Sequence, residues 1–136
     1  MNKKCQMRIP NLEEMDEQGA YGFLAQLLFN LDPAEEYDAR HEDDYVLEMP
    51  QSGERIRGRE NMRAFQEAYS TSGPYDRLSR IRLRRVLVRE RLWVAEGDAL
   101  DGGERKLSDV VLIVELKGGR MWRDRWYFAG PFEAPE

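Results

Sequence analysis

The chain has 136 residues and a mass of 16.0 kDa, which fits a single domain over residues 1–136 and is too short for two independent cores. Its 41% hydrophobic and 35% charged residues are typical of a globular protein and exclude a disordered or membrane-embedded chain. The net charge of −5 repels phosphate backbones. We therefore expect no nucleic-acid partner.

Few residues are available for metal or phosphate chemistry. Cys5 is the only cysteine and His41 the only histidine, so an internal disulfide and a cysteine-built zinc site are excluded. No carboxylates show calcium-loop spacing, and there is no glycine-rich phosphate loop. No apolar run approaches a membrane span, and the basic start lacks an apolar signal core. We expect a cytoplasmic protein with no metal, no cofactor and no membrane partner.

The first half of the sequence predicts three helices and a hairpin. Asn11 followed by Glu14 indicates a helix start, and Asp32-Pro33 indicates a second one. Alternation then predicts strands around the turn residues Pro50 to Gly53. In chain order we predict a helix from Asn11 to Leu31, a helix over 32–40, paired strands over 43–49 and 54–57, and a helix over 59–69.

The second half predicts extended structure throughout. Hairpin turns at Gly102-Gly103 and Gly118-Gly119 separate apolar stretches, which predicts strands over 78–88, 92–100, 106–116 and 121–128. Helices before a strand-rich half, with hairpin-length connections, indicate an α+β domain whose helices cover one face of a mostly antiparallel sheet. Val110 to Val114 is apolar at every position. We therefore predict that a second copy of the chain covers the outer sheet face in a homodimer.

The segment from Val46 to Met62 (VLEMPQSGERIRGREN and its final Met) and the closing segment from Gly119 to Pro135 resemble the nuclear-transport-factor-2-like superfamily, in its SnoaL-like branch. The resemblance covers nearly all of the chain from Leu12. It implies a cone-shaped, curved sheet wrapped around three helices, with an apolar cavity that opens at one end. Members include isomerases, cyclases, dehydratases and epoxide hydrolases, and also non-catalytic binding and dimerisation modules, so the fold alone does not decide function.

The last predicted strand carries the candidate acid. Strict alternation places Trp122, Asp124, Trp126 and Phe128 on one face, away from the arginines. A lone carboxyl group on an aromatic face suits a ligand cavity, where Asp124 would act as general acid or base or as a hydrogen-bond acceptor. Alternatively, Asp124 pairs with a neighbouring arginine.

His41 is the second candidate catalytic residue, because the resemblance implies that this part of the chain delivers a side chain to the cavity. If His41 approaches Asp124, the two would form an acid/base pair that works near neutral pH. The alternative is a histidine at the rim. Two departures from steroid-isomerase-like members argue against that particular mechanism: Met49 stands where their base is expected, and Leu112 stands where their oxyanion-binding acid is expected.

The predicted lining favours a flat apolar or aromatic ligand, although the same residues also suit an ordinary core. The candidate ligand-binding residues are Tyr45, Met49, Gln66, Trp93, Leu112, Trp122, Trp126 and Phe128. We predict a small-molecule pocket protein that acts without a cofactor as a lyase, isomerase or hydrolase; the alternative is a non-catalytic ligand-binding or dimerisation module.

Arginines are dense from Arg77 to Arg91, and Arg80, Arg82 and Arg84 share one strand face. Such a face could bind RNA, but no aromatic residue interleaves the arginines to stack on bases. We expect a solvated face that is balanced by Glu54, Glu60 and other acids.

Overall fold

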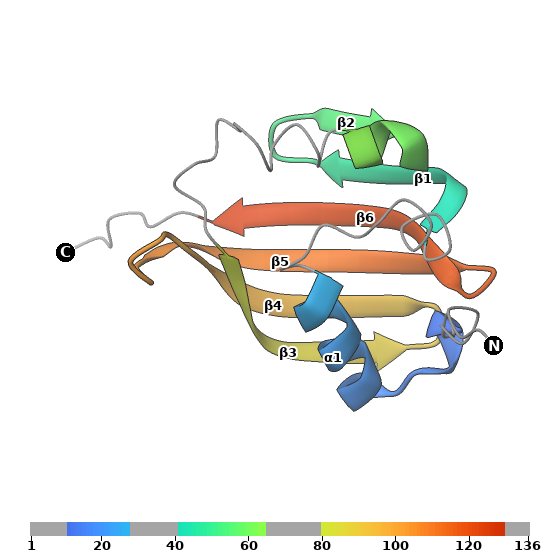
Figure 1. Ribbon diagram of the computed structural model, residues 1–136, viewed down its shortest axis with the longest axis horizontal. Coiled ribbons are helices and arrows are strands. Elements are labelled where there is room, and N and C mark those ends of the chain that lie inside the picture. Colours follow the sequence, from blue (N-terminus) through green and yellow to red (C-terminus); the bar gives the residue numbers. More distant parts are fainter. Residues whose placement is uncertain (1–10, 28–40, 65–79, 130–136) are drawn as a thin grey trace, which may run out of the picture.

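The structure is a computed structural model that describes residues 11–27, 41–64 and 80–129. Six strands form one curved, unclosed sheet in the order β2-β1-β6-β5-β4-β3 (Figure 1). Neighbours pair antiparallel except β1 and β6, which pair parallel. The predicted α+β class is confirmed. The strands are β1 (His41–Met49), β2 (Glu54–Arg57), β3 (Arg80–Arg89), β4 (Leu92–Leu100), β5 (Lys106–Lys117) and β6 (Arg120–Ala129).

The described helical segments lie in the N-terminal half: the 3-10 helix η2 (Leu12–Glu14), α1 (Glu17–Leu27) and residues 59–64. The predicted continuous helix from Asn11 is wrong, because two caps divide it. Asn11 accepts a hydrogen bond from the Glu13 N–H, and Asp16 accepts one from the Gly19 N–H at 2.8 Å. The predicted helix over 32–40 and the end of the third one lie outside the described residues. Among the helices described, none is long and apolar enough to cross a membrane.

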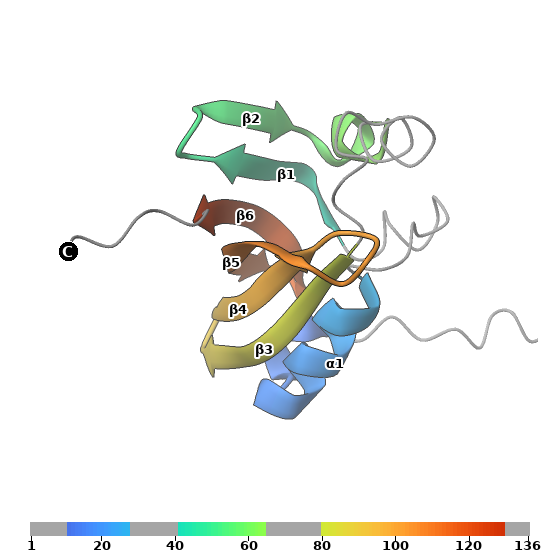
Figure 2. The same cartoon turned by 90° about the vertical axis from the view of Figure 1, so that its left-hand side faces the viewer.

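Helix α1 packs against β3, the last strand of the sheet (Figures 1 and 2). Two of its side chains satisfy backbone groups of that strand. The Tyr21 hydroxyl donates to the Leu83 carbonyl at 2.9 Å, and the Val88 N–H donates to the Glu17 carboxylate at 3.3 Å. Because unpaired strand edges invite pairing with other chains, these contacts protect this edge of the sheet.

Register shifts bend the sheet. One lies in β3 between Leu83 and Arg85, and another lies between β5 and β6 at Glu115 and Leu116. An extra residue in one strand increases local twist and bending, as the curvature in Figure 2 shows. Gly97 of β4 lies opposite the β3 shift, where a Cβ atom would stand 2.6 Å from the Arg82 carbonyl oxygen. The strands can approach this closely because residue 97 has no side chain.

The core lies between the concave face of the sheet and the helical segments. It is made of buried residues from α1, η2 and all of the strands from β3 to β6, with Tyr45 and Leu47 from β1 and Met62 from the segment 59–64. On β5, Val110, Leu112 and Val114 are buried, while Val111 and Ile113 between them are partly exposed on the other face. The two faces of this all-apolar stretch therefore differ in exposure.

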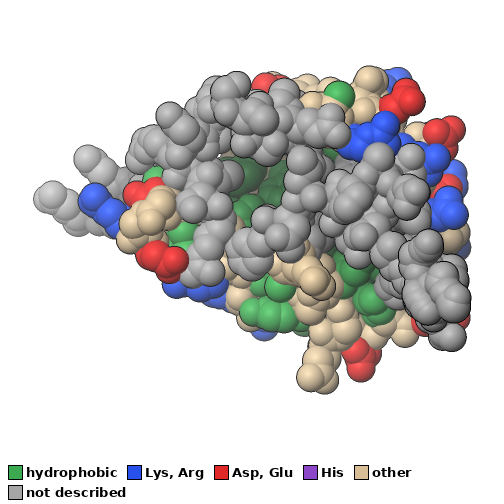
Figure 3. Space-filling model, in the orientation of Figure 1, with side chains coloured by type: hydrophobic (Ala, Val, Ile, Leu, Met, Phe, Trp, Pro, Cys, Tyr) green, Lys and Arg blue, Asp and Glu red, His purple; other side chains and the backbone are tan. Residues whose placement is uncertain are grey.

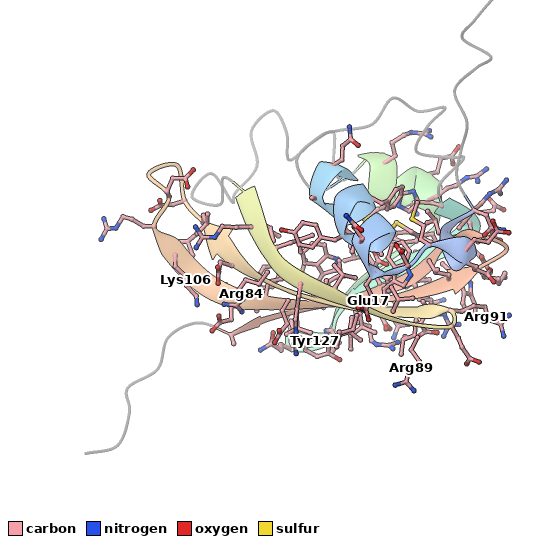
Figure 4. All side chains as sticks on the ribbon, turned by 90° about the horizontal axis from the view of Figure 1, so that it is seen from below. Glu17, Arg84, Arg89, Arg91, Lys106 and Tyr127 are labelled. Carbon is pink, nitrogen blue, oxygen red and sulfur yellow. The ribbon has the colours of Figure 1, made fainter. Side chains whose placement is uncertain are left out.

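The convex face carries the arginines of β3, and acids of β4 and β5 neutralise them. Asp98 accepts from Arg82 at 3.1 Å and from Arg84 at 2.9 Å, and Lys106 lies 3.2 Å from it. Burial raises the pKa of Asp98, but the hydrogen bonds from Arg82 and Lys106 outweigh this and hold it below its usual value. Figure 4 shows Arg84 and Lys106 on the side of the sheet opposite α1. The expected balance by acids is confirmed. Among the described residues the acids that pair with these arginines are Asp98, Glu96 and Asp109, and they do not include Glu54 or Glu60.

Candidate functional site

Strand pairing places the candidate acid in the middle of the concave face. Asp124 lies on β6 directly between Leu47 of β1 and Val114 of β5, and Trp93 of β4 follows Val114 in the same row. Side chains of one row on one face are neighbours, because adjacent strands are about 4.8 Å apart. Asp124 is only 3% exposed, and Trp93 is fully buried. The carboxyl group therefore stands among apolar side chains, as the sequence predicted.

Tyr45 is the hydrogen-bond partner of this carboxyl group. Its hydroxyl donates to Asp124 Oδ2 at 2.5 Å, across 79 positions of sequence. Burial raises the pKa of Asp124 to about 7, and the hydrogen bond from Tyr45 opposes that rise. Asp124 can therefore exchange a proton near neutral pH, which a general acid or base requires.

The arginines beside Asp124 in the sequence do not pair with it. Arg123 lies over the Trp122 ring, with its guanidinium carbon 4.3 Å from the ring centroid, and Arg125 binds Glu115 at 2.8 Å. The alternative interpretation of Asp124 as one half of an arginine ion pair is therefore wrong. Its charged form lacks a counter-ion among the groups that perturb its pKa, and this favours the neutral carboxylic acid.

His41 contacts Tyr45 rather than Asp124. Its ring meets the Tyr45 ring edge to face, with centroids 4.7 Å apart, and its side chain is buried. Its backbone carbonyl accepts a hydrogen bond from Arg59 at 3.0 Å. The predicted pairing of His41 with Asp124 is thus replaced by a chain of contacts from His41 to Tyr45 and from Tyr45 to Asp124.

Within the described part of the chain, three buried polar atoms of this face have no hydrogen-bond partner: Asp124 Oδ1, Trp93 Nε1 and Trp126 Nε1. Such an atom destabilises a folded chain by about 1–3 kcal/mol, so it is rare in a protein interior. Trp126 stacks on Phe128 with ring centroids 5.9 Å apart, and Phe23 of α1 meets the Trp93 ring at 6.1 Å. Packing therefore fixes both indole groups.

Trp122 does not share the face of Asp124, contrary to the prediction. Leu116 pairs with Met121 and Glu115 pairs with Arg123, so Trp122 is the extra residue of a bulge. Met121 therefore points into the core. Trp122 instead lies beneath the Lys117 ammonium group and close to the exposed Asp44, whose pKa it helps to lower. A bulge reverses strict alternation on one side of it, which is why the face of Trp122 was predicted wrongly.

The other predicted lining residues divide into core and partly exposed positions. Leu112 belongs to the buried core, and Met49 and Trp126 pack against it. Phe128 is partly exposed next to Trp126. Gln66 lies outside the described residues. Figure 3 shows apolar side chains near the centre of the face that carries α1. A ligand role for these residues stays a prediction.

Metal chemistry has no support in the described parts of the chain, where no group of three His, Cys, Asp or Glu side chains could hold an ion. The residue that the sequence undervalued is Tyr45, which was predicted as a polar contact but not as the partner of Asp124. The sequence pattern around Tyr45 predicts only that an aromatic side chain lies on the inner side of β1. Its pairing with Asp124 depends on the parallel contact between β1 and β6.

No protein-family model and no curated protein matches the chain. Solved structures do match it. A nuclear-transport-factor-2-like protein of unknown function from Burkholderia xenovorans LB400 is 29% identical, over 85% of this chain and 86% of its own, with a TM-score of 0.59. A Kribbella flavida protein, named provisionally as a ketosteroid isomerase, is 25% identical, over 75% of this chain and 70% of its own, with a TM-score of 0.63. An LEH-like epoxide hydrolase from M. tuberculosis is 21% identical, over 80% of this chain and 79% of its own, with a TM-score of 0.58.

The curved, unclosed sheet with helices in the N-terminal half is the α+β architecture of nuclear-transport-factor-2-like proteins. The chain belongs to the nuclear-transport-factor-2-like superfamily, as the sequence predicted. Its narrower assignment to the SnoaL-like branch stays a prediction.

Proposed function

We propose that the chain binds a small apolar or aromatic molecule and acts on it as an isomerase, lyase or hydrolase, with Asp124 as general acid or base and without a cofactor. The observation that carries this proposal is the buried carboxyl group with a pKa of about 7, held by Tyr45 on an aromatic face. Proteins of similar fold include one named provisionally as a ketosteroid isomerase and an epoxide hydrolase. Both names denote chemistry on small organic molecules, which supports the proposal.

Asp124 would work in one of two directions. As a base, its ionised form would take a proton from carbon next to a carbonyl group, and the rate would rise with pH up to about 7. As an acid, its neutral form would protonate a leaving or epoxide oxygen, and the rate would fall above about pH 7. Tyr45 and His41 would act as positioning residues. Tyr45→Phe removes a hydrogen bond that lowers the pKa of Asp124. The rise of the rate with pH, or its fall, should therefore move to higher pH in this variant.

The test uses α-tetralone, whose exchange of carbon-bound protons for deuterium is followed by NMR, and styrene oxide, whose ring opening is followed by chromatography. We expect Asp124→Asn to lower the rate of the catalysed reaction by about 100-fold or more. Asp109→Asn is the matched control, since Asp109 lies on the convex face at 49% exposure. Retained turnover in Asp124→Asn would contradict the acid/base role. Binding of both compounds without turnover would favour the alternative, a non-catalytic ligand-binding or dimerisation module.

We also propose that the chain pairs with a second copy through its convex face. Val111 and Ile113 point to that face from β5, and Leu87 of β3 is 44% exposed. Tyr127 lies on the same side of the sheet (Figure 4). Light scattering at micromolar concentration should give twice the chain mass of 16.0 kDa. Ile113→Arg should return it to a single chain mass, and a parent protein already at that mass would contradict the pairing.

A further inference from the structure

The three unpartnered polar atoms of the concave face include two donors of a single kind. An indole N–H can only donate a hydrogen bond, so Trp93 Nε1 and Trp126 Nε1 each require an acceptor atom. Neither finds one among the residues that the structure describes. The third indole group behaves differently, since Trp122 is partly exposed and its N–H is not among these buried atoms. Two of the three tryptophans therefore have a buried N–H donor without an acceptor among the described residues, and both lie on the face of Asp124.

The register brings these donors within reach of one small molecule. Trp93 and Asp124 flank Val114 in a single row, so their backbones are about 10 Å apart. Trp126 follows Asp124 by two residues on β6, which is about 7 Å along the strand. Side chains that start at these points and face the same way can contact opposite ends of a molecule the size of two fused rings.

The charge of the described part of the site favours a neutral ligand. Asp124 has no counter-ion among the groups that perturb its pKa, and Leu47, Val114 and Trp93 in its row are apolar. The buried His41 contacts Tyr45. A carboxylate or phosphate placed beside Asp124 would lose its hydration and meet no compensating cation among these described neighbours. A hydroxyl or carbonyl oxygen meets no such penalty.

We propose that the indole N–H groups of Trp93 and Trp126 are positioning donors that bind two separate oxygen atoms of the ligand, beside Asp124 Oδ1, so that the site selects neutral ring compounds with oxygen at both ends. This inference rests on the proposed small-molecule function and adds its selectivity. Stacking on Phe128 and the edge contact with Phe23 hold the two indole rings before the ligand arrives. Such preorganisation reduces the entropy lost on binding.

The experiment compares 6-hydroxytetralone, which has a ketone and a phenol at opposite ends, with tetralin, which has the same rings and no oxygen. Proton–nitrogen NMR of the full chain resolves the indole N–H signals, assigned by single tryptophan-to-phenylalanine variants. On saturation with 6-hydroxytetralone the Trp93 and Trp126 protons should move downfield, and the Trp122 proton should stay in place. Tetralin should produce no downfield movement. Unmoved Trp93 and Trp126 signals, or movement of only one of them, would overturn the inference.

Affinities supply the second measurement. Trp93→Phe and Trp126→Phe should each weaken binding of 6-hydroxytetralone by about five- to tenfold and leave tetralin binding nearly unchanged. Trp122→Phe is the matched control and should change neither. Equal losses for both compounds would show that the indoles only pack, which overturns the inference and leaves the proposed function standing. If neither compound binds the folded parent, the proposed small-molecule site and the inference both fail. Two folded variants are enough to assign all three indole signals of the parent chain, so one variant that does not fold leaves the NMR arm intact.

Discussion

Replacing Asp124 with asparagine should make the protein more stable at pH 8, although it removes the proposed acid or base. The pKa of Asp124 is about 7 in the folded chain because of burial, against an ordinary value of 3.8. The folded state therefore binds a proton that the unfolded chain has already released. This contribution to stability is complete below about pH 4 and is lost as the pH rises through about 7. The difference between the folded and the ordinary pKa of Asp124 corresponds to about 4 kcal/mol of the free energy of unfolding.

Asparagine stays neutral at every pH and can still accept the hydrogen bond from Tyr45. Urea denaturation at pH 5 and pH 8 should show a free energy of unfolding that falls with pH in the parent and much less in Asp124→Asn. Asp109→Asn is again the control. The hydrogen bond from Lys106 lowers the pKa of Asp109, so its contribution is lost only as the pH falls below its ordinary value of 3.8. This control should keep the parental slope, and equal slopes in all three proteins would refute a buried neutral Asp124.

Gly97→Ala should lower the free energy of unfolding by about 3 kcal/mol. The added Cβ atom would stand 2.6 Å from the Arg82 carbonyl oxygen and 3.2 Å from the Leu83 Cα, and both of these atoms are backbone. They cannot rotate away as a side chain can, so β3 must move outward from β4. Trp93 lies on the same strand as Gly97, and its fluorescence should report the altered packing.

Gly22→Ala provides the comparison for the same chemical change. Gly22 lies within α1, and a Cβ atom there would have nothing within 4 Å. Alanine is the better helix former, so this variant should gain up to about 1 kcal/mol. Urea denaturation of both variants measures the contrast. A Gly97→Ala protein as stable as the parent would mean that the strands do not approach each other this closely.

The three strands after residue 91 could be predicted to within one or two residues because their signals are local. Glycine pairs at 102–103 and 118–119 mark the hairpins, and Gly118 and Gly119 do adopt positive φ values of 62° and 79°. The start of α1 was predicted less well. Asn11 is a genuine cap, but of η2, and the sequence offers a second cap at Asp16 with nothing local to rank the two.

The sequence by itself determined the α+β class, the inward direction of Asp124 and the aromatic character of its strand, because alternation and turn chemistry depend on near neighbours. Only the tertiary structure decided that Tyr45 holds Asp124 and that Trp122 leaves its face. The first depends on a parallel pairing between strands 79 residues apart, and the second on one extra residue in a bulge. Both are properties of how strands pair, and alternation within a single strand contains no information about its partner.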